Sequence, residues 1–174
     1  MEEKVIHIPF NYNFFMESRR DVWVFYFKKS ANSYYTYSLL AVIFLIIGWF
    51  VDRNGGIPFC TLIGVGLSVY MLIYWYNLYK SKKRYFIKNK LHAEKHQQES
   101  LDAIFTFSEN GLQYQDKDRS YKMNWRLFAP LVIFRDNIFF IDEDTEALTF
   151  TISRQELGDA DYQELCAFLK DKIG

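Results

Sequence analysis

Two long apolar stretches separated by a short polar break constrain this chain more than any other feature. The first covers residues 34–51 and the second residues 57–79, and neither contains a charged residue. A helix rises about 1.5 Å per residue, so about 20 apolar residues cross a hydrocarbon core roughly 30 Å thick. We therefore predict a transmembrane helical hairpin over residues 34–79. The alternative is a helical hairpin buried inside a soluble protein.

The polar break and the flanks of the two stretches also fit a hairpin. Asn54-Gly55-Gly56 tolerates the positive φ angles of a tight turn, and Pro58 suits the first turn of a helix. Aromatic residues gather at the ends of both stretches, as expected at membrane interfaces. They are Tyr34, Tyr35, Tyr37, Trp49, Tyr74, Trp75, Tyr76 and Tyr79.

Small residues recur every four positions along the second apolar stretch, at Cys60, Gly64 and Ser68. They would line one helix face, and Ala41 and Gly48, one heptad apart in the first stretch, would face them. Small side chains let two helix backbones approach closely. The alternative is that Gly is simply common in spanning helices.

Basic residues set the predicted orientation. Residues 80–100 carry seven Lys or Arg against two Glu, whereas the break holds one Arg and one Asp. The positive-inside rule then places both termini in the cytoplasm of a cell (inner) membrane protein. Residues 1–33 lack the apolar core and cleavage site of a secretory signal. We read residues 80–100 as a helical neck that either binds anionic lipid headgroups or only fixes the orientation, through Lys80, Lys82, Lys83, Arg84, Lys88 and Lys90.

The segment before the hairpin, residues 1–33, gives a mixed signal. Residues 5–8 alternate as a strand does, and Pro9 ends the run. Residues 14–29 could be a helix capped by Asn13, although residues 22–27 have strand propensity. We favour an amphipathic helix at the membrane surface, because the segment is aromatic, flanked by basic residues and continuous with the first span.

From residue 101 to residue 174 the apolar period changes to two. Six short apolar runs separated by turn residues predict a meander of strands, and Gly158-Asp159 precedes a helix with an apolar stripe over residues 162–173. With the N-terminal strand added to protect an edge, the count is that of a pleckstrin-homology-like (PH-like) β-barrel closed by a C-terminal helix. The six runs are residues 104–108, 112–115, 121–125, 131–134, 138–141 and 148–152.

Three motifs in this region resemble the YcxB-like C-terminal domain of small bacterial membrane proteins. They are Phe105-Thr106-Phe107-Ser108-Glu109-Asn110-Gly111-Leu112, Tyr121-Lys122-Met123-Asn124-Trp125 and the closing helix from Ala160 to Ile173. The resemblance implies a membrane hairpin, a basic neck and a cytoplasmic domain, and it supplies no catalytic residues. The family often has a Pro-Lys-Arg-aromatic run before the last helix, whereas residues 153–157 here retain one base.

Enzyme and nucleic-acid functions find little support in the sequence. The chain has no Gly-rich phosphate loop, no Gly-x-Ser-x-Gly and no Cys-x-x-Cys. Residues 101–174 carry fourteen acidic and eight basic residues, so a nucleic-acid partner is not expected.

Two clusters could hold a metal but are better read as solvated groups. His92 and His96 share a helix face without a third ligand. An acidic run lies in a predicted turn and lacks calcium-loop spacing; it comprises Asp142, Glu143, Asp144 and Glu146. We predict no catalytic, cofactor or metal residues.

The sequence therefore predicts an α+β membrane protein: a two-helix hairpin with a cytoplasmic domain that acts as a docking or regulatory module and is not an enzyme. Its expected partners are the lipid bilayer and either a membrane protein or another copy of the chain. The alternatives are an anionic-lipid-sensing module and an uncharacterised enzyme centred on the acidic turn.

Overall fold

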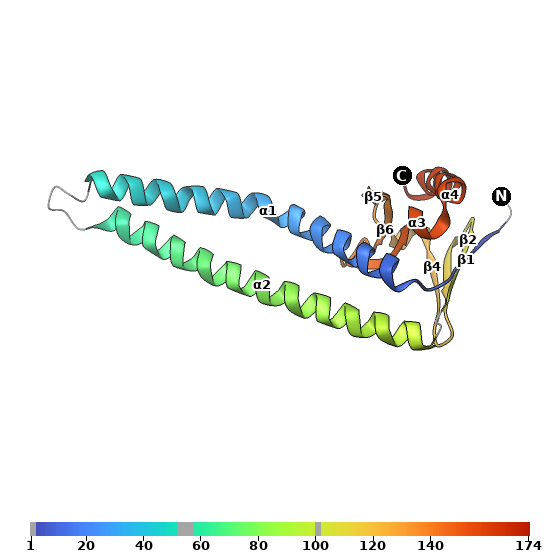
Figure 1. Ribbon diagram of the computed structural model, residues 1–174. Helices are drawn as coiled ribbons and strands as arrows, with labels where there is room; N and C mark the ends of the chain where they lie inside the picture. The colour runs from blue at the N-terminus through green and yellow to red at the C-terminus, as the bar shows by residue number, and fades with distance from the viewer. Residues whose placement is uncertain (1–2, 52–57, 100–101) are drawn as a thin grey trace. The chain divides into compact units, whose positions relative to one another are not determined.

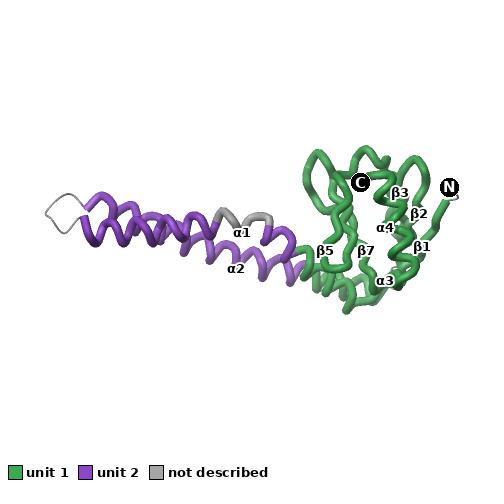
Figure 2. Tube along the Cα trace, turned by 90° about the horizontal axis from the view of Figure 1, so that it is seen from above, with its two compact units in different colours: residues 1–22, 89–174 green, residues 23–88 purple. Residues whose placement is uncertain are grey.

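The computed structural model describes residues 3–51, 58–99 and 102–174, with the backbone alone for residues 29–33. The chain is α+β, with two long helices and two antiparallel sheets. It divides into two compact units, residues 1–22 with 89–174 and residues 23–88 (Figure 2).

Two uninterrupted helices dominate the chain: α1 (Tyr12–Val51) and α2 (Phe59–Glu99) (Figure 1). Within the unit of residues 23–88 they run antiparallel, because Gly48 lies against Thr61 and the ring of Trp23 lies 5.4 Å from that of Tyr85. The predicted Asn54-Gly55-Gly56 turn falls outside the described residues. Both helices are long and apolar enough to cross a membrane, by length and composition.

Residues 14–29 are helical, which resolves the ambiguity of that segment. No proline interrupts α1, and the strand-prone run at 22–27 is carried within the longer helix. The predicted cap was wrong by two residues, since Asn11 and not Asn13 caps the helix. Its Oδ1 accepts hydrogen bonds from the backbone N–H groups of Asn13 at 2.9 Å and Phe14 at 3.2 Å.

All seven predicted strands are present in the described residues, but they do not close into a barrel. A four-stranded sheet has the order β1-β2-β3-β4 and a three-stranded sheet the order β5-β6-β7. The N-terminal strand pairs with β2, as expected for edge protection. The strands are β1 (Lys4–Ile8), β2 (Ala103–Ser108), β3 (Gly111–Gln115), β4 (Ser120–Asn124), β5 (Val132–Phe134), β6 (Asn137–Ile141) and β7 (Leu148–Ser153).

The barrel fails between β4 and β5. The 3₁₀ helix η2 (Trp125–Leu127) follows β4 directly, and Pro130 has no N–H to donate to a ladder. Phe128 forms one isolated bridge with Asp142. The chain therefore turns away from the first sheet before it begins the second.

The core of this unit joins both sheets to the last helix, α4 (Asp159–Ile173). Phe107 of β2 and Phe140 of β6 are almost fully buried, and Leu165 and Leu169 of α4 are completely buried. Burying each such side chain contributes about 1.5–3 kcal/mol. The predicted start of α4 at Gly158-Asp159 is confirmed.

A short helix that the sequence did not predict precedes α4: α3 (Arg154–Leu157). A capping box starts it, because Ser153 and Glu156 exchange hydrogen bonds between side chain and backbone. This fixes the direction in which residues 153–155 leave β7.

The hairpin between β5 and β6 has a two-residue turn at Arg135 and Asp136. Their φ angles are 49° and 60°, the left-handed pair of a type I′ turn. From the sequence, the turn between the runs 131–134 and 138–141 is expected at Asp136-Asn137. That expectation was wrong by one residue, since Asn137 pairs with Phe134 and begins β6. Neither turn residue is Gly, so surrounding contacts must hold the conformation.

Candidate functional site: a polar pocket beside the β5–β6 turn

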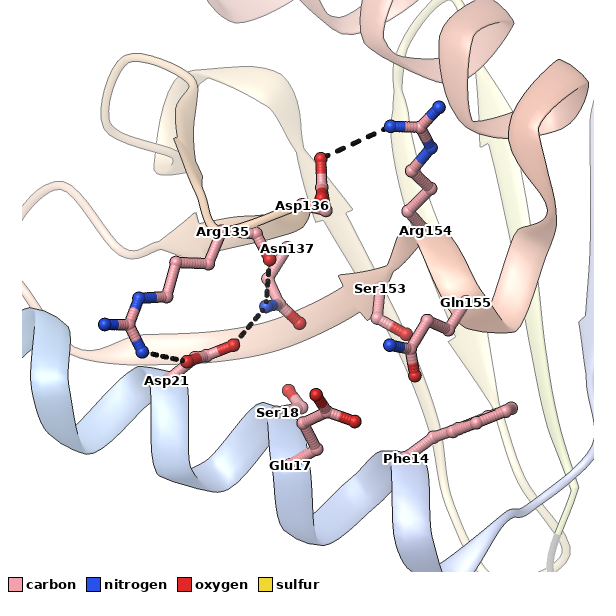
Figure 3. Close-up of a pocket in the computed structure, with 10 residues that line it drawn as sticks. All are labelled: Phe14, Glu17, Ser18, Asp21, Arg135, Asp136, Asn137, Ser153, Arg154 and Gln155. Atoms are coloured by element: carbon pink, nitrogen blue, oxygen red, sulfur yellow. Dashed lines mark hydrogen bonds and ion pairs between the residues drawn. The ribbon is translucent and has the colours of Figure 1, made fainter.

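A polar pocket of about 280 Å³ lies within the unit of residues 1–22 and 89–174 (Figure 3). Three segments line it: residues 14–21 of α1, and, more than a hundred residues later, the turn residues 135–137 and residues 153–155 where β7 passes into α3. The capping box and the type I′ turn position two of these walls.

Asp21 joins α1 to the turn. Nη1 of Arg135 donates to Asp21 Oδ1 at 3.0 Å, and Nδ2 of Asn137 donates to Asp21 Oδ2 at 3.0 Å. The Asp21 side chain is 11% exposed and that of Arg135 is 53% exposed. A carboxylate with so little access to water needs such partners, so this pairing holds the left-handed turn against the helix.

The amide of Asn137 has one orientation that satisfies its surroundings. Its Nδ2 also donates to the main-chain oxygens of Arg135 at 3.0 Å and Phe134 at 3.4 Å. All three neighbours of this nitrogen are acceptors, so a flipped amide would place oxygen against oxygen. The Oδ1 atom therefore points the other way, and it is buried without a hydrogen-bond partner within the described residues.

Arg154 stabilises both the β5–β6 turn and the start of α4. Its backbone N–H donates to the carbonyl of Asp136 at 2.8 Å, and its Nε donates to Asp159 at 2.6 Å. The hydrogen bond with Asp159 raises the pKa of the Arg154 guanidinium, and the charge of Asp136 adds to the effect. Both charges of the turn, Arg135 and Asp136, thus have partners of opposite sign.

The six basic residues singled out in the neck all lie on α2 with exposed side chains. Lys80 Nζ lies 6.0 Å above the Tyr76 ring, and Lys90 pairs with Glu94 at 3.7 Å. In the described part of the chain, Lys82, Lys83, Arg84 and Lys88 make no ion pair.

The small residues proposed for helix packing divide into two groups. Ala41, Gly48 and Gly64 are buried, whereas Cys60 and Ser68 are half-buried. A Cβ added to Gly64 would lie 2.9 Å from the backbone nitrogen of Leu45, so α1 and α2 approach closely there. The Ser68 hydroxyl donates to the Gly64 carbonyl of its own helix at 2.8 Å.

The two histidines and the acidic turn have local roles. The rings of His92 and His96 lie 5.9 Å apart, and the described residues contain no group of three or more metal-ligating side chains. Burial, and then the nearby His92, lowers the pKa of His96. Asp142 accepts hydrogen bonds from the backbone N–H and the hydroxyl of Thr145, which lowers the pKa of the Asp142 carboxyl.

Sequence reasoning missed the polar pocket. The α1 wall lies more than a hundred residues before the other two walls along the chain, and none of the three contains a recognisable motif. One signal was available: Asp21 is an acidic residue inside an aromatic helical segment, next to the buried Val22. A buried carboxylate in such a place calls for a partner elsewhere in the chain.

Comparison of the chain with protein-family models, with curated proteins and with solved structures gives no match. The YcxB-like resemblance therefore stays a prediction that rests on the three motifs.

Proposed function

We propose that the chain is a multi-pass protein of the inner cell membrane that presents a small cytoplasmic docking or regulatory domain and catalyses no reaction. The observation that carries the proposal is the exposure of the two apolar helices. Residues 34–51 have a mean hydropathy of 1.9, the best window of α2 reaches 1.6, and 11% of each window is buried.

A soluble hairpin would bury these windows. Instead, large apolar side chains are exposed along both helices, including Trp49 at 62%, Phe50 at 70% and Leu72 at 70%. Monomeric soluble proteins rarely expose contiguous apolar surfaces of this extent, whereas a bilayer covers them. Together with the basic neck, this arrangement supports two spans with both termini in the cytoplasm.

The proposed docking role rests on the charge of residues 101–174 and on their tether to the membrane. Residues 101–174 carry an excess of acidic residues, and a membrane tether raises the effective concentration of this domain toward any membrane partner. The partner we propose is a membrane protein or a second copy of the chain. The PH-like and YcxB-like assignments belong to the same proposal, and a fold alone does not fix a function.

Pull-down from native membranes after crosslinking tests the docking role. The full chain should recover a protein partner that a variant lacking residues 101–174 does not recover. Recovery of the same partner by both chains would contradict docking through this domain and assign the contact to the hairpin.

A second candidate function, sensing of anionic lipids, is favoured by the exposure of all six basic residues selected in the neck. Each basic residue near an anionic leaflet contributes on the order of 1 kcal/mol, screened by salt. If the full chain recovers no protein partner but binds anionic vesicles through residues 80–99, this second function replaces the first.

A further inference from the structure

The polar pocket contains two hydrogen-bond acceptors that the protein itself leaves unused. One is Oδ1 of Asn137, a residue 4% exposed whose amide oxygen has no partner in the described residues. The other is the carboxylate of Glu17, an exposed residue that lines the same pocket and has no ion pair among the described residues. Figure 3 shows both groups, with the side chain of Gln155, turned toward the space between α1 and the start of α3.

The cationic side chains of the pocket are already neutralised. Arg135 is paired with Asp21, and Arg154 is paired with Asp136 and Asp159. Glu17 therefore remains as the one unbalanced charge among the described residues that line the pocket. A buried polar group without a partner is uncommon, and it marks a place where a donor from outside the chain is expected.

The size and lining of the pocket suit a small polar ligand. Phe14 also lines the pocket, but Figure 3 shows its side chain directed away from Glu17 and Asn137. A pocket of about 280 Å³ has room for a small organic molecule and is lined mainly by polar groups.

We propose that this pocket binds a small organic cation carrying a primary ammonium group, which donates hydrogen bonds to Asn137 Oδ1 and Glu17. An ammonium group has three donors and no acceptor, so it matches the unused acceptors. A hard metal ion fits less well, because it requires six or more oxygen ligands or an ordered water shell. The inference is independent of the proposed docking function.

Calorimetric titration of the full chain in detergent micelles with the diamine putrescine tests the proposal. Putrescine should bind, and 1,4-butanediol, which has hydroxyls in place of the ammonium groups, should not. The Glu17→Gln variant should bind putrescine about tenfold or more weakly, because it loses a charged acceptor while keeping the side-chain shape. The matched control is Glu143→Gln, an exposed glutamate outside the pocket, which should bind as the natural chain does.

A second variant tests the effect of charge in the pocket without changing either acceptor. Gln155→Arg leaves both acceptors in place but adds a positive charge at an exposed position of the pocket, so it should also weaken binding. The proposal is overturned if putrescine does not bind, if the diol or K⁺ binds equally well, or if Glu17→Gln retains full affinity. None of these failures bears on the pull-down that tests docking.

Discussion

Replacement of Gly48 by Ala should loosen the packing of α1 against α2. A Cβ at position 48 would lie 2.6 Å from the backbone nitrogen of Thr61 and 2.9 Å from its Cα. Ordinary contacts between such atoms are about 3.5–4.0 Å, so the two helices must separate by about 1 Å. Overpacking of this kind costs about 1–3 kcal/mol.

Gly66→Ala supplies the matched control, because a Cβ there meets no atom within 4 Å. Both substitutions gain about 1 kcal/mol of helix propensity, so the difference between them isolates the clash. We expect Gly66→Ala to stabilise the hairpin and Gly48→Ala to be less stable than Gly66→Ala by about 1–3 kcal/mol. The natural chain should be more stable than Gly48→Ala.

The assay is unfolding of the full chain in detergent micelles by increasing amounts of sodium dodecyl sulfate, followed by far-ultraviolet circular dichroism. Gly64→Ala should behave like Gly48→Ala, since its Cβ would lie 2.9 Å from the backbone nitrogen of Leu45. Equal midpoints for Gly48→Ala and Gly66→Ala would refute the close approach of the two helices.

Three further predictions concern the charged groups. Asp21→Asn should lower the free energy of unfolding by about 1–2 kcal/mol, because Arg135, which is half-exposed, loses its mostly buried carboxylate partner. A double-mutant cycle with Arg135→Gln that shows no coupling would contradict the pairing. The hydrogen bond from Lys172 lowers the pKa of Glu109 below its ordinary value of 4.5, so the stabilisation from this pair is present above that pH and is lost as the pH falls through the folded-state pKa. In thermal melting from about pH 6 to about pH 3, the melting temperature of Glu109→Gln should therefore fall less than that of the natural chain. An identical profile for the two chains would exclude this linkage. A peptide of residues 80–99 with Lys82→Gln and Lys83→Gln should bind anionic vesicles about 2 kcal/mol more weakly than the natural peptide at low salt. Equal binding of the natural peptide to neutral and to anionic vesicles would refute the electrostatic explanation.

The strands could be predicted because their signal is local. Phe105 and Phe107 alternate with Thr106 and Ser108, and the two phenylalanines are the buried pair. The same reasoning found β1, since an exposed meander edge needs a partner. The division into two sheets could not be predicted in this way. The alternation of apolar and polar residues indicates which side chains face the core, but it does not indicate which strands are hydrogen-bonded to each other.

Helix boundaries and the pocket show two other limits. Asn11 and Asn13 are equally good caps by residue type, and only the backbone path decides that Asn11 accepts the hydrogen bonds. The pocket depends on Asp21 meeting Arg135 and Asn137, a contact across 114 and 116 residues. Neither a turn motif nor a charge pattern near one of these residues predicts the other two.

The central claim, a hairpin that spans the membrane with both ends in the cytoplasm, is tested most directly by cysteine accessibility in intact cells. Single cysteines are introduced by Asn54→Cys in the predicted connection and by Gln98→Cys at the end of α2, after replacement of Cys60 and Cys166 by Ala. A membrane-impermeant maleimide should label the first variant in intact cells and the second only after the cells are opened. Labelling of Gln98→Cys in intact cells, with Asn54→Cys protected, would contradict the proposed topology.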